Sequence, residues 1–362
     1  MEIARAGFGV LGLGGCRLHR YIHHYPRHDG SPSAYPWPRG IDDEELDRIT
    51  DRLMTEMTLE EKVHQLSGDA GLPLLIRIGA LVFLYGRFPN VYAGRNARRG
   101  IPPLSFSDGP RGVVIGRATC FPVAMARGAS FDVDLEARVG DALGQEVRAS
   151  GANYFGGLCI NLLRHPAWGR AQETYGEDPH HLGEMGVALL TAVQRHNVMA
   201  CAKHFALNNI ENSRFYVDVT LDDRTLHEVY LPHFRRCVAA GVMSVMSAYN
   251  KVRGHWCGHS TFLLDEVLRR EWGFDGFVTS DWIWGIHGTA EPAIAGMDVE
   301  MPRTKHYGRK LVAAARSGAV PAEVIDRNAR RVVRTKLRTV TRDDPRSYPK
   351  ELIACAEHRA LA

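Results

Sequence analysis

The stretch Gly273-Phe-Asp-Gly-Phe-Val-Thr-Ser-Asp281-Trp282 decides how the rest of the chain is interpreted. Its aromatic and β-branched run follows a Gly-Phe-Asp-Gly turn and predicts a short strand, with the carboxylate of Asp281 and the ring of Trp282 at its end. A carboxylate in this position can stabilise, or trap covalently, a carbon that becomes positively charged as one of its bonds breaks. The alternative is structural, with Asp281 acting only as the N-cap of a following helix. These ten residues by themselves support both interpretations equally.

Short apolar runs alternate with amphipathic segments over most of the chain. The predicted strands are residues 80–85, 104–107, 154–162, 198–207, 242–249, 276–281 and 297–301. The predicted helices are residues 42–57, a helix opened by the capping box Thr58-Leu-Glu-Glu61, and residues 133–149, 180–196, 222–240, 260–272, 307–317 and 321–337. This alternation is typical of parallel βα units, so we expect an α/β fold of the (β/α)8 TIM-barrel type. Seven strands are clear and the eighth is weak, so the barrel is expected to be irregular or to lack a strand.

The composition excludes several classes of protein. The 362 residues are 45% hydrophobic and 24% charged, which is ordinary for a soluble globular protein, and the net charge of +4 favours neither nucleic acid nor a membrane surface. The basic stretch 303–342 has helical spacing and predicts a solvated helix face. Seven cysteines without a CxxC pair indicate reduced thiols and a cytoplasmic location, and no apolar run reaches membrane-spanning length.

The two ends of the chain differ from its middle. Residues 1–40 contain several prolines and glycines and predict an extension that is poorly packed and dispensable. Gly7-Phe-Gly9-Val-Leu-Gly12 matches GxGxxG there, but no strand precedes it, and the stretch is also a poor signal peptide. Residues 41–340 are assigned to the barrel and residues 341–362 to a linker that leads to a second domain.

Polar side chains gather at the predicted strand ends, where parallel barrels hold their reactive groups. Besides Asp281 and Trp282, they are Asp108, Arg170, Lys203, His204 and Tyr249. Donors and acceptors that converge on one carboxylate suit a ligand rich in hydroxyl groups. Lys203 is the most informative of them, because an ammonium group inside an apolar strand needs a partner.

Several of these residues also have a purely structural interpretation. Asp108 precedes Gly-Pro and can be a turn residue, and Arg170 can pair with Glu173 or Glu177. His204 taken singly is more often a satisfied polar residue than a ligand. Asp178-Pro179 is best interpreted as an N-cap followed by a proline at the first helical position.

The chain resembles the barrel domain of family 3 glycoside hydrolases of the β-glucosidase type. The matching segments follow the family order between residues 42 and 340, and they are Gly100-Ile-Pro-Pro-Leu, Ser107-Asp-Gly-Pro-Arg-Gly, Trp168-Gly-Arg-Ala-Gln-Glu-Thr-Tyr-Gly-Glu-Asp-Pro, Ala202-Lys-His-Phe, Met246-Ser-Ala-Tyr-Asn and Trp272-Gly-Phe-Asp-Gly-Phe-Val-Thr-Ser-Asp-Trp. The resemblance implies that Asp281 is the catalytic nucleophile. It also implies that Tyr249 stands beside the nucleophile and that Trp282 lines the sugar site. The residues implied to hold the sugar hydroxyls are Asp108, Arg170, Lys203 and His204.

Two departures from the family pattern narrow this expectation. Phe205-Ala-Leu-Asn-Asn follows Lys203-His204 where the hexosaminidases of the family carry Gly-His-Gly, which disfavours that branch. The β-glucosidase type takes its acid/base glutamate from a second domain, and Glu357-His-Arg-Ala-Leu-Ala362 resembles only the beginning of that domain. We therefore expect a partner chain or domain to supply this residue. Within the chain, Glu173, Glu211 and Glu300 are available in principle, and the sequence gives no geometric reason to prefer one of them.

The sequence thus predicts the nucleophile-bearing half of a retaining, exo-acting β-glycosidase. Its substrate is expected to be a β-linked glucoside or oligosaccharide, without a metal or organic cofactor. Two alternatives stay open. One is a sugar-binding module of weak activity that lacks the acid, and the other is a Schiff-base lyase that uses Lys203.

Overall fold

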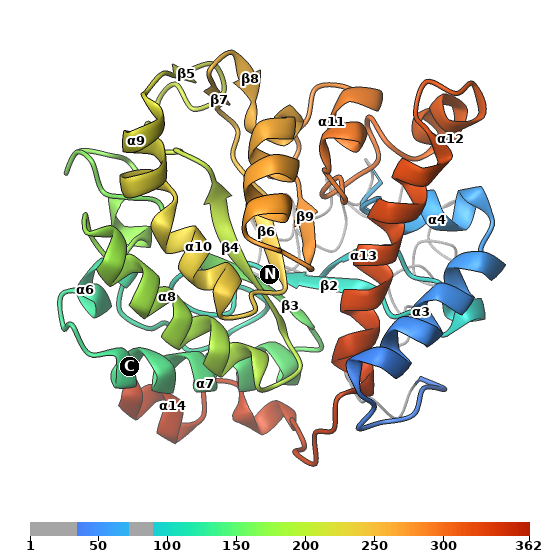
Figure 1. Ribbon diagram of the computed structural model, residues 1–362. Coiled ribbons are helices and arrows are strands. Elements are labelled where there is room, and N and C mark those ends of the chain that lie inside the picture. Colours follow the sequence, from blue (N-terminus) through green and yellow to red (C-terminus); the bar gives the residue numbers. More distant parts are fainter. Residues whose placement is uncertain (1–34, 72–89) are drawn as a thin grey trace, which may run out of the picture.

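A curled, mixed β-sheet forms the centre of the computed structural model, which describes residues 35–71 and 90–362 (Figure 1). The strand order is β1-β2-β3-β4-β6-β9, in which β1 is antiparallel to β2 and all the other neighbours are parallel. The strands are β1 (Val91–Ala93), β2 (Leu104–Ser107), β3 (Tyr154–Cys159), β4 (Met199–Phe205), β6 (Ser244–Ser247) and β9 (Phe277–Thr279). The predicted α/β class is confirmed.

Isolated β-bridges continue the sheet beyond its two edge strands. Thr279 of β9 pairs with Val299, Ser67 pairs with Glu300, and Gly68 pairs with the end of β1. The predicted strand 297–301 is therefore present only as bridges, and the predicted strand 80–85 lies outside the described residues. A complete barrel of eight parallel strands is not shown in the part of the chain that the structure describes.

Two features of the sheets were not predicted. One is β1, which runs against its neighbour, and the other is a small sheet made of β5 (Asp218–Val219), β7 (Lys251–Val252) and β8 (His255–Trp256). Strands of two or three residues are too short to show a periodic pattern of apolar residues. The small sheet lies at the upper end of the molecule in Figure 1, on the side to which β4 points.

Helices pack around the main sheet, and several begin where the sequence predicts. The side chain of Thr58 and that of Glu61 make both bonds of the predicted capping box, and Asp178 caps the helix that begins at Pro179. The α-helices are α3 (Asp43–Glu56), α4 (Leu59–Gln65), α6 (Ala124–Gly128), α7 (Val133–Ala149), α8 (Pro179–Gln194), α9 (Asp223–Thr225), α10 (Pro232–Ala239), α11 (Ala290–Ala295), α12 (Arg309–Arg316), α13 (Ala322–Thr341) and α14 (Ala356–Leu361). The predicted helix 260–272 is the π-helix η6 (Phe262–Glu271), and a second π-helical turn, η4 (Leu226–Tyr230), joins α9 to α10. No helix among residues 35–71 and 90–362 is long and apolar enough to cross a lipid bilayer.

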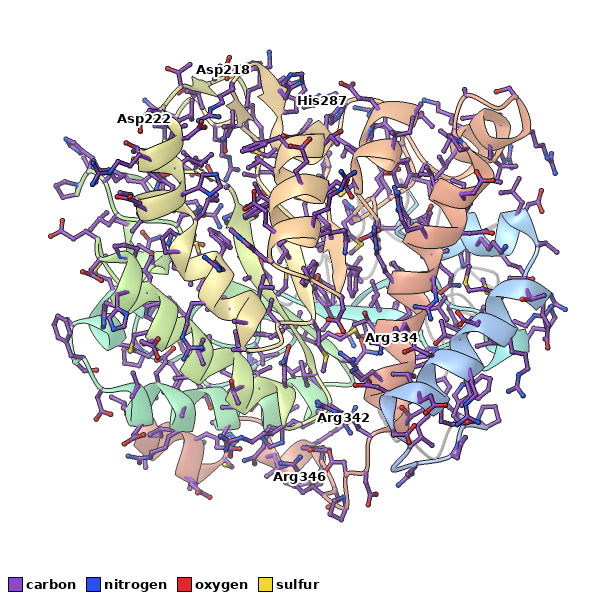
Figure 2. The ribbon with its side chains drawn as sticks, viewed as in Figure 1. Asp218, Asp222, His287, Arg334, Arg342 and Arg346 are labelled. Carbon is purple, nitrogen blue, oxygen red and sulfur yellow. The ribbon has the colours of Figure 1, made fainter. Side chains whose placement is uncertain are left out.

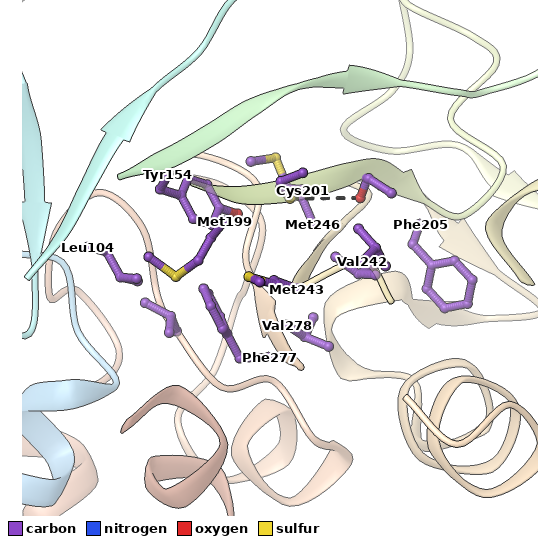
Figure 3. Close-up of a cluster of buried hydrophobic side chains, with 14 of the residues drawn as sticks. Leu104, Tyr154, Met199, Cys201, Phe205, Val242, Met243, Met246, Phe277 and Val278 are labelled. Atoms are coloured by element: carbon purple, nitrogen blue, oxygen red, sulfur yellow. Dashed lines mark hydrogen bonds between the residues drawn. The ribbon is translucent and has the colours of Figure 1, made fainter. Parts of the chain in front are cut away.

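Large apolar side chains fill the concave side of the sheet (Figure 3). Tyr154, Met199 and Phe277 come from three different strands, and each is at most 2% exposed. The Tyr154 hydroxyl lies 3.0 Å from the Ser244 hydroxyl, which gives this buried phenol a hydrogen-bond partner. Because the interior is packed, a ligand can reach the strands only at their ends.

The two ends of the sheet are covered by different parts of the chain. Figure 2 shows Asp218, Asp222 and His287 at the end that carries the small sheet, and Arg342 and Arg346 at the opposite end, where the chain leaves α13. From there the chain passes through a 3-10 turn, η7 (Lys350–Leu352), to α14, which lies along α7 (Figure 1). The assignment of residues 341–362 to a linker stays a prediction. The extension predicted for residues 1–40 lies mainly outside the described residues, and within it Trp37 Nε1 donates a hydrogen bond to Gly100 O at 2.8 Å.

Candidate active site

Asp281 is a buried carboxylate that directly follows the strand end at β9 and Ser280. No helix begins there, since residues 282–285 form a turn, so the N-cap interpretation is wrong. Its Oδ1 accepts a hydrogen bond from Trp282 N at 2.7 Å, whereas Oδ2 has no hydrogen-bond partner among the described residues. Burial raises the pKa of Asp281 above its ordinary value, against the lowering effect of the nearby Arg170 charge. A carboxylate with one unengaged oxygen is therefore present in a poorly hydrated position.

Lys203 has the partner that its place in an apolar strand demands. It is 2% exposed, and its Nζ lies 2.6 Å from Oδ1 of Asp108, at the end of β2. Burial lowers the pKa of Lys203, but the charge of Asp108 outweighs this effect, so the pKa lies above its ordinary value. The lysine stays a cation, and the Asp108 side chain remains 45% exposed to any ligand above it.

Arg170 and His204 form the next part of the cluster. Arg170 Nη1 donates to His204 Nε2 at 3.1 Å, and Arg170 also holds both carboxylate oxygens of Glu173, at 3.0 and 2.7 Å. The predicted structural role of Arg170 as a partner of Glu173 is therefore present together with its place in the site. Burial lowers the pKa of His204 far below its ordinary value, and the charges of Arg170 and Lys203 lower it further. The imidazole is neutral, and because arginine can only donate, its proton is on Nδ1.

The neutral His204 ring connects this cluster to Asp281. His204 Nε2 lies 3.7 Å from Asp281 Oδ2, and Nδ1–H donates to Asn161 Oδ1 at 3.1 Å. Asn161 also accepts from the His204 backbone N–H and donates to its carbonyl, each at 2.8 Å. Asn161 was not predicted, although it follows β3 and the rule that found the other residues at strand ends applies to it.

Tyr249 and Trp282 form the side of the site next to the carboxylate. The Tyr249 hydroxyl donates to Trp282 O at 2.7 Å, and burial together with the Asp281 charge raises the Tyr249 pKa well above its ordinary value. The Trp282 ring packs on Phe106, with 4.7 Å between the ring centroids. Arg214 lies over the Tyr249 ring at 4.9 Å and was not predicted, because it stands in a loop that carries no strand signal.

A cavity of about 280 Å³ lies beside part of this cluster, and of the predicted residues it is lined by Asp108, Arg170 and Trp282. Its walls include Asp108, Arg170 and Glu173 on the polar side and Phe106 and Trp282 on the aromatic side. This volume is just below about 300 Å³, where the usual range for ligand pockets begins, and it suits one small ring. Polar groups on one side and an aromatic face on the other fit a sugar, whose hydroxyls need hydrogen bonds and whose C–H groups pack on rings.

The structure thus brings all seven predicted residues to one end of the main sheet, with Arg170 contributed by the loop that follows β3, and their roles stay predictions. Among the described residues, no group of three or more His, Cys, Asp or Glu side chains is placed to hold a metal ion. Of the three glutamates considered from the sequence, Glu173 is bound by Arg170, and Glu300 accepts from the backbone N–H groups of residues 305–307. Glu211 pairs with Arg214 through Oε1, while its Oε2 is buried without a hydrogen-bond partner among the described residues.

Comparison with known proteins places this site in a family. The model of the glycosyl hydrolase family 3 N-terminal domain matches residues 91–335. A β-glucosidase of Rhizobium radiobacter is 40% identical over 295 residues, which are 79% of this chain and 34% of that protein. A β-glucosidase of Bacteroides ovatus is 37% identical over 344 residues, which are 87% of this chain and 43% of that protein. This chain therefore spans between a third and a half of the length of these relatives.

Solved structures agree with the sequence comparison. The β-glucosidase DesR of Streptomyces venezuelae, in complex with D-glucose, has a TM-score of 0.76 and 31% identity over 87% of this chain and 40% of its own. A β-glucosidase of Thermotoga neapolitana, in complex with glucose, has a TM-score of 0.73 and 31% identity over 86% of this chain and 46% of its own.

Proposed function

The chain belongs to glycosyl hydrolase family 3, and from this membership we propose that it is the nucleophile-bearing part of a retaining, exo-acting β-glucosidase. Its substrate is a β-linked glucoside or oligosaccharide, from which the sugar at the non-reducing end is removed. The observation that carries the proposal is the buried carboxylate of Asp281, whose Oδ2 has no hydrogen-bond partner among the described residues and on which the charges of Arg170 and Lys203 act. The relatives named as β-glucosidases, including one solved with D-glucose, support the choice of glucosides.

Asp281 is proposed to attack the anomeric carbon through Oδ2. The bond from that carbon to the leaving oxygen breaks, a bond to Asp281 forms, and the leaving oxygen takes a proton from an acid about 5 Å away in enzymes of this mechanism. Water then releases the sugar, with the same acid now acting as the base. Burial disfavours the ionised carboxylate, and the positive charge that develops on the sugar relieves this cost during the reaction.

The other site residues are proposed to hold the sugar. Lys203 and Arg170 donate to hydroxyl oxygens, while the half-exposed Asp108 accepts from hydroxyl groups. Pairs of oxygens on adjacent hydroxyls suit such a mixture of donors and acceptors. His204 is proposed to hold a hydroxyl through its ring as well, and Trp282 to pack against the apolar face of the sugar.

We propose that the acid/base residue comes from outside the described part of this chain. Glu173 and Glu211 each carry an ion pair with an arginine, which holds the carboxylate in place. A general acid has to be free to reach the leaving oxygen. Glu300 is surrounded by backbone N–H groups, which bind both of its oxygens.

An irregular barrel is part of the same proposal. The six strands and the bridged segments 67–68 and 299–300 follow one another around a ring, with β1 antiparallel to β2. Such a ring supports the expectation of a (β/α)8-type barrel in which two of the eight positions are reduced to bridges.

The Schiff-base alternative is disfavoured by the state of Lys203. A lysine of that type attacks as the neutral amine, which requires a lowered pKa. The Asp108 carboxylate 2.6 Å away instead raises the Lys203 pKa above its ordinary value. The ion pair favours a binding role.

The test uses 2,4-dinitrophenyl β-glucoside, whose leaving group departs without protonation. Asp281 is expected to release one equivalent of phenolate and to become heavier by one hexosyl unit in the intact mass spectrum. Without a base, release of the sugar should be slower by roughly 10²–10⁴-fold. Azide should accelerate turnover because it attacks without needing a base.

The outcomes separate the candidate functions. Sugar binding without a burst would identify a binding module and refute the glycosidase proposal. Rapid hydrolysis of cellobiose would instead show that an acid/base residue exists within the 362 residues. Borohydride trapping of a carbonyl substrate on Lys203 would support the lyase.

A further inference from the structure

The loop of residues 108–121 forms one wall of the candidate sugar cavity. It begins at Asp108, and Val114 and Ile115 line the cavity farther along. The loop is folded on itself, because Val114 N bonds to Asp108 O at 3.3 Å and Phe121 N bonds to Arg111 O at 2.7 Å. These two bonds connect the start of the loop at Asp108 with its middle and its end. A contact that holds the end of the loop therefore also affects the position of Asp108.

Thr119 is the point at which this loop is attached to the helical layer. The helix α7 carries Glu146, which is fully buried. One oxygen of Glu146 accepts from Thr119 N at 2.9 Å, and the other accepts from Thr119 Oγ1 at 2.6 Å. The loop packs so closely here that a Cβ atom at Gly112, where φ is 144°, would stand 2.1 Å from Thr119 O.

The same carboxylate also holds the C-terminal segment. Ala354 N and His358 Nδ1 each lie 2.9 Å from Glu146 Oε1, and His358 lies in the first turn of α14. Glu146 therefore joins two segments that are more than 200 residues apart along the chain, the cavity loop and the segment of η7 and α14. All four groups around Glu146 use its two oxygens, so a change in one bond alters the carboxylate that the others share.

A second anchor of the loop makes the Glu146 connection specific. Arg127 donates to Pro122 O at 2.5 Å and to Pro110 O at 3.2 Å, and it pairs with the buried Glu136 at 2.7 Å. Among the described residues, neither Arg127 nor Glu136 makes a hydrogen bond or ion pair with residues 341–362, so this anchor holds the loop independently of α14. Loss of the Glu146 anchor should shift the loop without unfolding it.

We propose that Glu146 is a positioning residue that couples the docking of α14 to the shape of the sugar cavity. When α14 is docked, His358 and Ala354 fix the Glu146 carboxylate, Glu146 fixes Thr119, and the loop holds Asp108 and Val114 against the cavity. By thermodynamic reciprocity, a bound sugar stabilises the docked α14. The coupling rests on the proposed function for its sugar ligand, while the mechanical connection does not.

The experiment breaks the connection at three places in the full chain, with Thr119→Val, Glu146→Gln and His358→Ala. Glu146→Gln is expected to weaken the connection because its amide N–H group must face either Thr119 N or the donors around the other oxygen, which are Thr119 Oγ1, Ala354 N and His358 Nδ1. Each of these groups needs an acceptor and would meet a donor instead. Affinity for 1-deoxynojirimycin, a glucose-shaped inhibitor, should fall about threefold to tenfold in each variant, the range typical of residues that couple two sites. Titration calorimetry measures this affinity.

Two further readouts separate coupling from a general loss of stability. In His358→Ala, amide hydrogen exchange in residues 109–120 should become faster, although His358 does not contact the loop. The double variant Thr119→Val/His358→Ala should bind the inhibitor no more weakly than the weaker single variant, because both changes break one connection. Additive losses would overturn the proposal.

The matched control weakens the C-terminal segment 341–362 at a different residue, Tyr348. The Tyr348 hydroxyl donates to Asp344 at 2.7 Å and lies 3.0 Å from His196 Nδ1, without touching Glu146. Tyr348→Phe should lower the thermal midpoint while leaving inhibitor affinity and loop exchange unchanged. If Tyr348→Phe changes loop exchange as much as His358→Ala does, Glu146 is not the connection.

The outcomes also distinguish failure of the coupling from failure of the proposed function. A wild-type chain that binds the inhibitor, with unchanged affinity and loop exchange in His358→Ala, would overturn the coupling alone. A wild-type chain that does not bind, with faster loop exchange in His358→Ala, would overturn the proposed function and leave the mechanical connection standing. If Glu146→Gln lacks a native circular dichroism spectrum, Thr119→Val and His358→Ala decide between these outcomes.

Discussion

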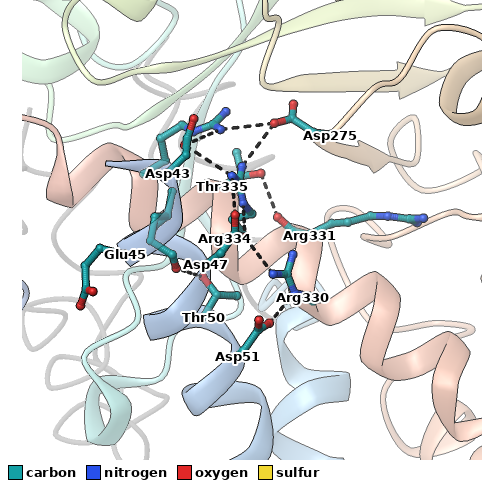
Figure 4. A network of polar contacts seen from close by, with 12 residues as sticks. Asp43, Glu45, Asp47, Thr50, Asp51, Asp275, Arg330, Arg331, Arg334 and Thr335 are labelled. Carbon is teal, nitrogen blue, oxygen red and sulfur yellow. Dashed lines mark hydrogen bonds and ion pairs between the residues drawn. The ribbon is translucent and has the colours of Figure 1, made fainter. Parts of the chain in front are cut away.

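Acidic and basic side chains gather in two places, the outer contact between α13 and α3 and the candidate site, and they have opposite effects on stability there. On the outside, α13 faces α3, where Arg330 and Arg334 bind Asp47 at 2.8 Å and the Asp47 side chain stays 37% exposed (Figure 4). In the candidate site, Asp281 is buried, and its Oδ2 lies 3.7 Å from Nε2 of His204, whose neutral ring has no charge to pair with it. The outer carboxylates are paired and hydrated, whereas the inner one is neither.

The outer ion pairs therefore stabilise the fold, whereas the buried carboxylate of Asp281 lowers the stability of the fold. Exposed ion pairs contribute about 0–1 kcal/mol each, because water already solvates both charges. A buried polar atom without a partner costs about 1–3 kcal/mol. The pKa shifts agree with this distinction, since Arg334 lowers the pKa of Asp47 and burial raises that of Asp281. The basic stretch of α13, predicted as a solvated face, is thus in part a face that packs against acidic residues of α3.

The largest expected effect comes from the same substitution made in the two groups. Asp281→Asn should reduce turnover of 2,4-dinitrophenyl β-glucoside by at least about 10⁴-fold, because the amide cannot form the glycosyl intermediate. Asp51→Asn, in the outer network, should leave turnover unchanged. Steady-state rates of phenolate release measure both. A burst that survives in Asp281→Asn would remove Asp281 from the proposed role.

The second prediction concerns the pair of Lys203 and Asp108, which lies between these extremes, with one partner buried and the other half exposed. Asp108→Asn leaves the buried ammonium without its ionic partner and should lower the free energy of unfolding by about 2–3 kcal/mol, at or just below the range for fully buried pairs. Lys203→Met leaves only the hydrated carboxylate and should cost less than about 1 kcal/mol. Both variants should lose sugar affinity. Urea denaturation with equal slopes measures the stabilities, and equal losses in both variants would contradict the asymmetry.

The third prediction follows from the raised pKa of Asp281. The folded state holds the Asp281 proton to a higher pH than the unfolded chain does, so stability falls as the pH rises from the unfolded pKa through the folded pKa. Asp281→Asn cannot ionise at this position, so the variant does not lose stability in this way as the pH rises. Its thermal midpoint should therefore exceed that of the wild type at pH 7, and the difference should shrink as the pH falls toward 4. Scanning calorimetry between pH 4 and 8 measures the two midpoints. If Asp281→Asn is less stable than the wild type at pH 7, burial of the ionised carboxylate does not lower the stability and the prediction is wrong.

The smallest effect is expected in the outer network. Arg330→Ala removes the bonds to Asp47 and Asp51 and should lower the free energy of unfolding by only about 0.5 kcal/mol. The difference should shrink further in 0.5 M salt, because exposed charges are screened over about 4 Å there. A loss of several kcal/mol in the free energy of unfolding that does not depend on salt would contradict this prediction. It would show that the charges of the outer network are shielded from water, as that of Asp281 is.

Several elements could be predicted from the sequence because their causes are local. The strand Leu104–Ser107 and the helix Val133–Ala149 have the predicted bounds, and Thr58 makes the predicted capping box. Such elements depend on apolar periodicity and on bonds between residues three or four positions apart. The direction of β1 could not be predicted, since a three-residue strand takes its partner and its direction from the tertiary fold.

The sequence by itself determined which residue types stand at the strand ends, and therefore which chemistry the site can hold. Only the tertiary structure decided how they meet. The bond between Lys203 and Asp108 spans 95 residues and depends on the curvature of the sheet. Arg214 entered the site from a loop, and Glu146 received its contacts from Thr119 and from His358, which are far apart along the chain. The raised pKa of Asp281 likewise arises from burial by residues of several strands, because desolvation depends on everything packed around a group rather than on its neighbours in sequence.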